Sequence, residues 1–424
     1  MSTPDSSFPA TYKLVPAAEI KQRITNAQTA LAETELYGIL ILQNIDRYYF
    51  TGTLQDGILW LPTTGEPIFW VRRSRERARL ESPLTDIRPQ PLSSADLKTK
   101  LAAVIPAQPA NIGLELDVIP VQLLTRMQKL LPAATKIHDA SLLIRKLRAC
   151  KSPYEIRCIK GAAAIMDKVM LYASTIIKEG MSEIELMAEL EHQARRLGHL
   201  GIVRMRGFNN ELFFGHALTG PESARRGYLD SPTNGLGLSP AFSQGAGHSL
   251  IQRGIPISID FMVNYEGYLA DLTRMFSLGA PAANIRDAHE KLLTLNRELV
   301  NLLKPGIECG AIFSKALEMA ADFGFADYFL GHGPDKVSFV GHGVGLEVDE
   351  FPFIARNNKM VIEKDMVVAL EPKLIFAPHQ NSFSNTLDLP ETIITTETTY
   401  VITPDSAIPL TLSPEKIKIT CTEY

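Results

Sequence analysis

One order of elements, a helix pair followed by strands, recurs in the last two thirds of the sequence. The predicted helices of the two copies cover 152–180 and 182–198, then 285–303 and 311–323. The strand-like runs lie at 201–214 and 256–278 in the first copy, and near Val337, Val367 and Ile393 in the second. Similar junctions, KEGM from Lys178 and KPGI from Lys304, separate the helices of each pair. Such a repeat predicts a duplicated α/β unit whose two sheets close around one central cleft.

The start of the first of these helices is marked by a capping box. Ser152 precedes Pro153 and lies three residues before Glu155, a pattern in which the serine caps the helix, proline takes its first position and glutamate bonds back to the cap. Ser182 and Glu185 repeat the box at the next helix. We therefore place a structural boundary just before Ser152.

The residues before this boundary alternate strand-like and helical patterns, as an α/β layer does. The strand-like runs begin at Tyr37, Asp56, Glu66 and Asn111, and a helical stretch runs from Ala18. A chain of 424 residues is longer than one hydrophobic core usually supports. We therefore predict two domains, 1–150 and 151–424.

The composition argues against several classes of partner. The chain has 43 Lys and Arg against 47 Asp and Glu, a formal net charge of −4, which gives no basic field for nucleic acid or an anionic membrane. Its 4 cysteines form no CxxC pair, which argues for a reducing compartment without structural zinc. Neither a signal-peptide pattern nor an apolar run of about 18 residues occurs. We expect a cytoplasmic protein.

Two acids lie in the segment PISIDFMVNYEGYLADLTRMFSLG, which reads as two strands joined by a tight turn. With the turn centred between Tyr265 and Glu266, Asp260 and Asp271 stand directly opposite one another, with β-carbons about 5 Å apart. Two carboxylates this close repel each other unless a cation lies between them. We therefore predict a divalent metal here. The competing interpretation pairs Asp271 with Arg274 and leaves Asp260 at a strand end in solvent.

Two further residues are candidate ligands. His342 lies between glycines in FVGHGVGLEVDEFP, and glycine lets the backbone pass close to a ligand; a hydrogen-bonded structural histidine is the alternative. Glu371 follows strand-like residues in VVALEPKLIF, and Pro372 then ends regular pairing. An edge strand with Glu371 facing solvent explains that pattern equally. Each feature alone is ambiguous, so the prediction depends on their combination.

The order of these four residues resembles a known metal signature. Two Asp eleven positions apart, then His in GHGVG, then Glu in an EP dipeptide, are similar in order and spacing to the metal ligands of the methionine aminopeptidase, prolidase and creatinase superfamily. The resemblance covers essentially the whole chain. It implies an α/β (α+β) protein with a creatinase-like N-terminal domain and a pita-bread domain of pseudo-twofold duplicated ααββ units. It also implies that Asp260, Asp271, His342 and Glu371 hold one or two divalent ions, commonly Mn, Co, Fe or Zn.

The fifth ligand of the family is a Glu in a strand of the form E(D/N)T followed by β-branched residues. The segment PETIITTE aligns most simply with Pro390 at that position and Glu391 one step later. A shift of one residue along a strand turns the side chain to the opposite face. Glu391 therefore serves as the fifth ligand only if a bulge re-aims it.

Other departures concern proton transfer and substrate contacts. The family's HE after GHGxGLxx is Asp349-Glu350 here, and the PHG before the first ligand is Ser243-Gln244-Gly245. The predicted catalytic residues are Glu371, Asp349 and His248, and the predicted substrate-binding residues are His216, Gln244 and Glu350. For His248 the alternative is an exposed loop residue, and for His216 it is a hydrogen-bonded core histidine.

Three functions are consistent with these features. The first is a metal-dependent hydrolase similar to Xaa-Pro aminopeptidases and prolidases, in which a metal-bound water attacks the carbonyl of a small peptide or amide. The second is the same fold with a non-peptidase C–N hydrolysis, as creatinase performs without metal. The third is a non-catalytic binding member that has lost full metal binding. Relatives commonly dimerise, which implies a homodimer.

Overall fold

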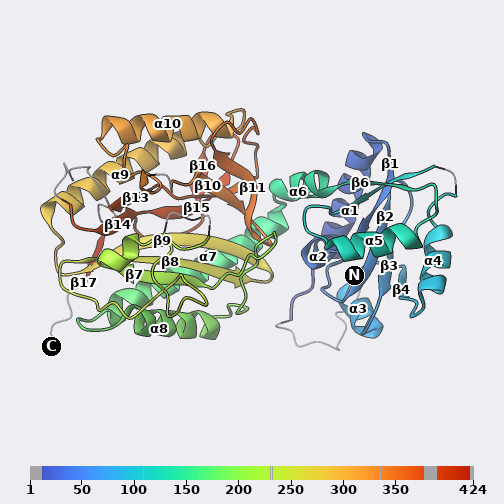
Figure 1. The fold of residues 1–424 in the computed structure, drawn as a ribbon, viewed down its shortest axis with the longest axis horizontal. Coiled ribbons are helices and arrows are strands. Elements are labelled where there is room, and N and C mark those ends of the chain that lie inside the picture. The colour runs from blue at the N-terminus through green and yellow to red at the C-terminus, as the bar shows by residue number, and fades with distance from the viewer. Residues whose placement is uncertain are drawn as a thin grey trace. The chain divides into compact units, whose positions relative to one another are not determined.

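The computed structural model describes residues 12–107, 109–229, 231, 233–333, 336–376 and 389–420. The chain divides into two compact units, Met1–Arg148 and Ala149–Tyr424, which we call the N-terminal and C-terminal units (Figure 1). Each unit has a sheet and a hydrophobic core of its own. None of the described helices is long and apolar enough to cross a membrane.

The N-terminal unit is built on a six-stranded mixed sheet. Its strands are β1 (Leu36–Ile41), β2 (Gly57–Pro62), β3 (Ile68–Val71), β4 (Ile87–Pro89), β5 (Asn111–Leu114) and β6 (Lys136–Asp139). Its helices are α1 (Ala17–Ala32), α2 (Asn44–Thr51), α3 (Arg75–Glu81), α4 (Ser94–Ala102), α5 (Val121–Leu130) and α6 (Ser141–Ala149). The strand order is β4-β3-β2-β1-β5-β6, with β1 antiparallel to β2 and parallel to β5.

The strand-like runs of this unit match four of these strands. The predicted starts fall within two residues of β1, β2, β3 and β5, whose apolar side chains are mostly buried. The edge strands β4 and β6 were not predicted. They are short and largely exposed, so they lack the apolar run that distinguishes a strand in the sequence.

The C-terminal unit contains four long helices and a large sheet. The helices are α7 (Pro153–Ile176), α8 (Glu183–Arg196), α9 (Ala283–Leu302) and α10 (Cys309–Asp322). The first strands are β7 (Gly215–Thr219), β8 (Pro256–Tyr265), β9 (Tyr268–Leu278), β10 (Phe339–Val344) and β11 (Val348–Ala355). The remaining strands are β12 (Val367–Leu370), β13 (Lys373–Phe376), β14 (Thr392–Thr395), β15 (Glu397–Ile402), β16 (Ala407–Pro409) and β17 (Lys418–Thr420).

The repeat appears as two similar halves of one sheet. The main path of the nine-stranded sheet is β11-β10-β12-β15-β9-β8-β7, and Figure 1 shows its strands between the pair α9 and α10 and the pair α7 and α8. The two sheets predicted for the two copies are joined into one. β15 pairs antiparallel with β9, through Glu397 opposite Thr273 and Thr398 opposite Leu272, so the two copies form a continuous sheet.

The predicted capping boxes begin α7 and α8. The Ser152 hydroxyl accepts from the backbone N–H of Glu155 at 3.2 Å, and the Glu155 carboxylate accepts from the backbone N–H of Ser152 at 2.9 Å. Ser182 and Glu185 make the same pair of bonds at 3.3 and 2.8 Å. These bonds satisfy N–H groups that the first turn of a helix leaves unpaired.

The hairpin of β8 and β9 has a different register from the predicted one. Glu266 and Gly267 have φ of 52° and 94°, the positive values that both central residues of a type I′ turn require. The turn is therefore centred between these two residues, one position later than predicted, and direct opposition of Asp260 and Asp271 is wrong. The two acids are diagonal neighbours on one face. The observed pairs are Tyr265 with Tyr268, Asp260 with Thr273, and Met262 with Asp271.

Candidate metal centre

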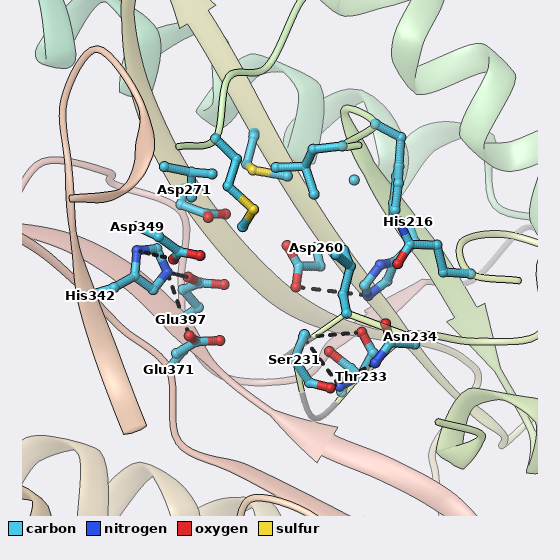
Figure 2. A pocket seen from close by; sticks show the side chains of 18 of the residues that line it. His216, Ser231, Thr233, Asn234, Asp260, Asp271, His342, Asp349, Glu371 and Glu397 are labelled. Atoms are coloured by element: carbon cyan, nitrogen blue, oxygen red, sulfur yellow. Dashed lines mark hydrogen bonds and ion pairs between the residues drawn. The ribbon is translucent and has the colours of Figure 1, made fainter. Parts of the chain in front are cut away.

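A polar cavity of about 180 Å³ lies at the junction of the two copies (Figure 2). It gathers side chains from strands of both halves of the sheet. Its carboxylates are Asp260, Asp271, Asp349, Glu371 and Glu397, and its nitrogen-bearing side chains include His216, Asn234, Gln244, His342 and Lys373. The cavity therefore concentrates more acids than bases among its described lining residues, and the acids fall into two groups.

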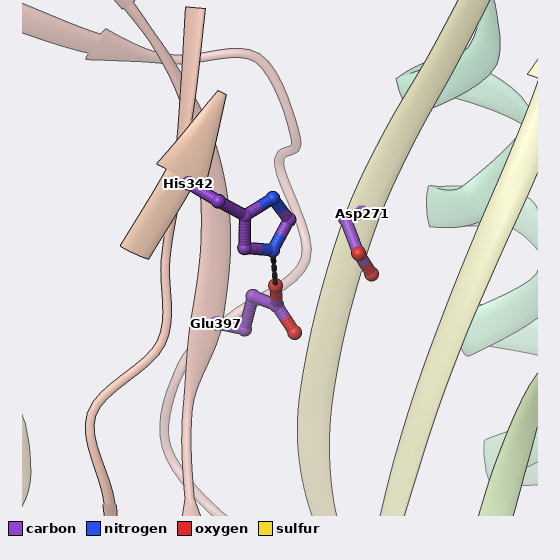
Figure 3. Close-up of side chains that lie close together, drawn as sticks. All are labelled: Asp271, His342 and Glu397. Atoms are coloured by element: carbon purple, nitrogen blue, oxygen red, sulfur yellow. Dashed lines mark ion pairs between the residues drawn. The ribbon is translucent and has the colours of Figure 1, made fainter. Parts of the chain in front are cut away.

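The first group consists of Asp271, His342 and Glu397, which face one another from three strands (Figure 3). One ligand atom from each of these residues lies within 4.8 Å of the other two. Their exposed fractions are only 5%, 4% and 1%. Within the described structure, Oδ1 of Asp271 and Oε1 of Glu397 are buried without a hydrogen-bond partner. Buried carboxylate oxygens are costly unless a cation or a proton satisfies them.

The pairing of β15 with β9 brings the two acids of this group together. Glu397 begins β15 opposite Thr273, whose hydroxyl donates to Oε2 of Glu397 at 2.6 Å. Two residues along β15, the Thr399 hydroxyl accepts from the backbone N–H of Asp271 at 3.0 Å and donates to its carbonyl at 2.7 Å. These bonds hold one oxygen of Glu397 and leave the other facing the cavity.

Burial and mutual repulsion disfavour the ionised forms of both acids. Burial, with the nearby charges of Glu371 and Asp260, raises the pKa of Glu397 to about 8. Burial and then the charge of Glu397 raise the pKa of Asp271 well above its ordinary value. Two carboxylates and an imidazole are donors that suit a borderline divalent cation, which would compensate both acids at once. The residues present therefore fit a divalent ion.

His342 is held by one ring nitrogen and presents the other to the acids. Its Nδ1 lies 3.2 Å from the carbonyl oxygen of Gly343 and 3.3 Å from Oδ1 of Asp349. Its Nε2 lies 3.5 Å from Oε1 of Glu371 and 3.8 Å from Oε1 of Glu397. Burial lowers the pKa of His342, but the charges of Asp349 and Glu371 outweigh burial and raise it. A carboxylate at the second nitrogen is the usual way to orient a metal-binding histidine.

The second group of acids surrounds a lysine. Nζ of Lys373 lies 2.6 Å from Oε2 of Glu371, 3.3 Å from Oδ2 of Asp260 and 3.4 Å from the Thr233 hydroxyl. Lys373 is 1% exposed. Burial lowers its pKa, but Glu371 and Asp260 outweigh burial and raise it well above the ordinary value. Burial raises the pKa of Asp260, but Lys373 and His216 outweigh it and lower that pKa. This half of the cavity therefore contains an ion pair that is complete without a metal.

Two family models match the sequence. The model of metallopeptidase family M24 matches residues 157–404, which is more than half of the chain. The chain belongs to metallopeptidase family M24. The model of the creatinase/prolidase N-terminal domain matches residues 23–150. Family M24 is a family of divalent-metal-dependent enzymes, and this M24 chain has a group of buried side chains able to hold a metal.

Known Xaa-Pro dipeptidases are among the relatives of this M24 chain. The Xaa-Pro dipeptidase of Pyrococcus horikoshii is 27% identical over 338 residues, which cover 79% of this chain and 84% of that protein. The structure of dipeptidase PepE from Mycobacterium ulcerans has a TM-score of 0.77 at 22% identity, covering 97% and 100% of the two chains. The prolidase structure from P. horikoshii has a TM-score of 0.74 at 23% identity, covering 93% and 99%. The fold is therefore a creatinase-like domain followed by a pita-bread domain.

The glutamate of the segment PETIITTE that lines this cavity is Glu397. The prediction of Glu391 as the fifth ligand is therefore wrong. Glu391 is exposed and borders a different pocket, together with Pro390 and Thr219. It precedes β14, which pairs with β13 outside the nine-stranded sheet. The sequence contains a signal for Glu397, because ETTYVI is an acid followed by threonines and β-branched residues. The first glutamate of PETIITTE was chosen, and the second is the one in the cavity.

The structure also corrects the predicted roles of His248 and Glu350. His248 is exposed and lies outside the described lining of the cavity. This agrees with the alternative interpretation, an exposed loop residue. Glu350 is buried, but it pairs with Lys151 at 3.0 Å and accepts from the backbone N–H of Glu347 at 3.0 Å. Asp349 lies at a bulge of β11 and has a positive φ of 61°. It lines the cavity, whereas Glu350 is not among the described lining residues.

His216 and Gln244 also line the cavity. They are 5% and 2% exposed, and neither the ring nitrogens of His216 nor the amide atoms of Gln244 have a hydrogen-bond partner among the described residues. Burial lowers the pKa of His216 to about 4, so its imidazole is neutral at pH 7. Nε2 of His216 lies 3.8 Å from Oδ2 of Asp260. These polar atoms are available to a ligand in the cavity.

Lys373, like Glu397, lines the cavity although the sequence analysis assigns it no role. A signal for it lies in the segment VVALEPKLIF, because residues two apart in an extended chain point to the same side. Glu371 and Lys373 are two apart, and the structure places both side chains in the cavity. The segment does not contain the second partner of Lys373, Asp260, which belongs to β8 in the other copy.

Proposed function

We propose that this chain is a metal-dependent hydrolase that cleaves small Xaa-Pro peptides. The observation that carries the proposal is the group of Asp271, His342 and Glu397, with two buried carboxylate oxygens that have no partner in the described structure. Membership of family M24 and the similarity to an Xaa-Pro dipeptidase support the reaction and the class of substrate.

The residues of the first group would hold the ion. A divalent cation at such a site acts as a Lewis acid and lowers the pKa of a water molecule. Two carboxylates and one imidazole suit Mn, Co, Fe or Zn. Asp349 engages Nδ1 of His342 at 3.3 Å, which fixes the ring so that Nε2 is directed toward the acids.

Glu371 is suited to proton transfer in this reaction. Its Oε2 is held by Lys373 at 2.6 Å, while its Oε1 faces Nε2 of His342 at 3.5 Å. A carboxylate fixed in this way at the edge of the site can take a proton from the attacking water and pass it to the departing amine.

His216 and Gln244 supply hydrogen bonds to a peptide. The neutral imidazole of His216 has one N–H that can donate to a carbonyl oxygen, and Gln244 offers both an amide donor and an acceptor. Donors placed where negative charge develops on the carbonyl stabilise the transition state. These two residues are the substrate contacts that the proposal assigns.

The test is hydrolysis of an Xaa-Pro dipeptide such as Ala-Pro. We expect turnover by protein loaded with Mn²⁺ or Co²⁺, loss of turnover after chelation and recovery when the ion is returned. Ala-Ala is the matched peptide without proline, and Asp271→Asn is the matched protein. Absence of turnover on every Xaa-Pro peptide, or turnover that neither chelation nor Asp271→Asn reduces, would contradict the proposal.

A second candidate function is C–N hydrolysis without a metal, as in the creatinase branch of the superfamily. The observation that favours it is the ammonium of Lys373 among the acids, because the chain itself supplies a cation there. Its test is a screen of small guanidino and amide compounds against chelator-treated protein. Turnover there, with none on Xaa-Pro peptides, would replace the first proposal.

Assembly and location follow the family expectation. We propose that the chain forms a homodimer, because its relatives commonly dimerise. We also propose that it is cytoplasmic, because its cysteines form no CxxC pair, which argues for a reducing compartment. Light scattering on the purified protein gives the mass in solution, and a monomer at micromolar concentration would contradict this part of the proposal.

A further inference from the structure

We propose that the ammonium of Lys373 takes the place of a second cation, so that the centre binds one divalent ion, at Asp271, His342 and Glu397. This inference rests on the proposed function, because it concerns the same metal centre and separates its carboxylates into two groups. Two carboxylate groups of similar burial lie side by side in the cavity, yet among the described side chains only one of them has a lysine or arginine within ion-pair distance.

The geometry around Lys373 is complete. An ammonium has three N–H donors, and Nζ has three acceptors in Glu371, Asp260 and Thr233, at 2.6, 3.3 and 3.4 Å. A divalent ion binds carboxylate oxygens at about 2.0–2.2 Å. An ion that shared Oε2 of Glu371 and Oδ2 of Asp260 would overlap the ammonium that already lies between them. The lysine is fully buried, so it leaves this position only by rearranging the cavity.

The group of Asp271, His342 and Glu397 shows the opposite pattern. Asp271 and Glu397 are at least nine-tenths buried, and each has one oxygen without a partner in the part of the chain that the structure describes. No Lys or Arg lies within ion-pair distance of either residue among the described side chains. The two groups meet at Glu371, whose Oε2 contacts the lysine and whose Oε1 faces His342.

This arrangement changes the role of Asp260. The family resemblance makes it the first metal ligand, whereas its contacts with Lys373 and His216 make it a positioning residue. It holds the ammonium in place, and the ammonium in turn fixes Glu371. Asp260→Asn should therefore leave the ion in the centre, while Asp271→Asn should release it.

The experiment is a count of bound ions. Chelator-treated full-length protein is titrated with Mn²⁺ by calorimetry, the metal content is measured after gel filtration, and the EPR spectrum separates an isolated Mn²⁺ from a spin-coupled pair. We expect one ion per chain and an isolated signal for the wild type. Lys373→Ala, which opens the space between Asp260 and Glu371, should bind two ions and give a coupled signal.

Two variants act as controls. Lys373→Arg keeps the positive charge and should bind one ion. Lys151→Ala removes another buried, ion-paired lysine outside the cavity, and it should also bind one. Circular dichroism checks that each variant is folded.

The outcomes separate the inference from the proposed function. Two ions in the wild type overturn the inference and leave a metal-dependent hydrolase. No ion in the wild type overturns both. One ion in a folded Lys373→Ala shows that the lysine does not exclude a second. If that variant does not fold, Asp260→Asn decides, because loss of the single ion there makes Asp260 a ligand and contradicts the inference.

Discussion

The two acid groups of the cavity differ in how their charge is compensated. Around Lys373, Asp260 and Glu371 form an ion pair that the chain completes by itself. Around His342, Asp271 and Glu397 keep oxygens that no described group satisfies. Burial is similar in both groups, so burial does not explain the difference. One lysine does, and it distinguishes a closed structural pair from a site that requires a ligand.

The number of acids in a cavity does not by itself show where cations bind. A count of carboxylates predicts a matching number of cations, but the positions of those cations depend on which side chains extend into the cavity. A buried pair lacking one partner is costly, and this cost applies to both groups. In one group the lysine removes this cost on folding, and in the other a proton or a bound ion has to remove it.

The largest expected effect comes from Asp271→Asn. The substitution removes a carboxylate that faces His342 and Glu397, and we expect loss of the bound ion and a fall in kcat/KM of about a thousandfold or more. Asp260→Asn is the matched change in the other group, and its metal content should stay at the wild-type level. Equal loss of metal in the two variants would show that the groups do not differ.

The second prediction concerns stability. Lys373→Met leaves Asp260 and Glu371 buried without their ammonium, so the free energy of unfolding of metal-free protein should fall by about 3 kcal/mol. Urea denaturation gives the value. Lys315→Met removes an exposed lysine that pairs with Glu318 at 2.7 Å, and we expect no measurable change there, because exposed ion pairs contribute little to stability. Similar losses in both variants would contradict the special role of Lys373.

The third prediction tests the orientation of His342. Asp349→Asn weakens the carboxylate contact to Nδ1 at 3.3 Å, and partners of this kind change metal affinity by about 10- to 100-fold. Calorimetry with Mn²⁺ should show weaker binding with the stoichiometry unchanged. An unchanged affinity would mean that the backbone carbonyl of Gly343 orients the ring alone.

The fourth prediction is a pH dependence of metal-free protein. Burial raises the pKa of Glu397 from 4.5 to about 8, so between these values the native state binds a proton that the unfolded chain lacks. Its contribution to stability is therefore fully present below about pH 4.5 and is lost as pH rises toward 8, at about 1 kcal/mol per pH unit. Glu397→Gln should flatten this fall in thermal unfolding curves. Glu115, whose pKa burial also raises to about 8, contributes equally to both proteins, so only the difference between them is diagnostic.

The smallest effects are expected at two residues outside the cavity. Glu391→Gln and His248→Ala change exposed side chains, so activity and metal content should stay within about twofold of the wild type, as is usual at such positions. A loss of metal in Glu391→Gln would restore it as a ligand and would contradict the assignment of Glu397.

Local signals in the sequence account for much of the fold. The capping boxes at Ser152 and Ser182 need only residues three apart, and four strands of the N-terminal unit, β1, β2, β3 and β5, begin close to where apolar runs begin. The order of Asp260, Asp271 and His342 was sufficient to associate these residues with one site. Each of these inferences uses spacing along the chain, which the sequence contains directly.

The errors arose where long-range pairing decides. The register of the β8–β9 hairpin depends on which two residues form the turn, and the glycine at 267 places it one position later than predicted. Glu397 enters the cavity because β15 pairs with β9, and Asp260 meets Lys373 across the two copies. Neither contact is visible from spacing, because each joins segments more than a hundred residues apart.

The antiparallel contact between β9 and β15 has a consequence for the order of events during synthesis. Asp271 is made with the first copy of the repeat, and Glu397 begins a strand close to the end of the second. A nascent chain that has emerged only as far as β14 contains Asp271 and His342 but lacks Glu397, the third residue of the group. Contacts this distant along the chain form late, so the group is completed only when β15 docks on β9.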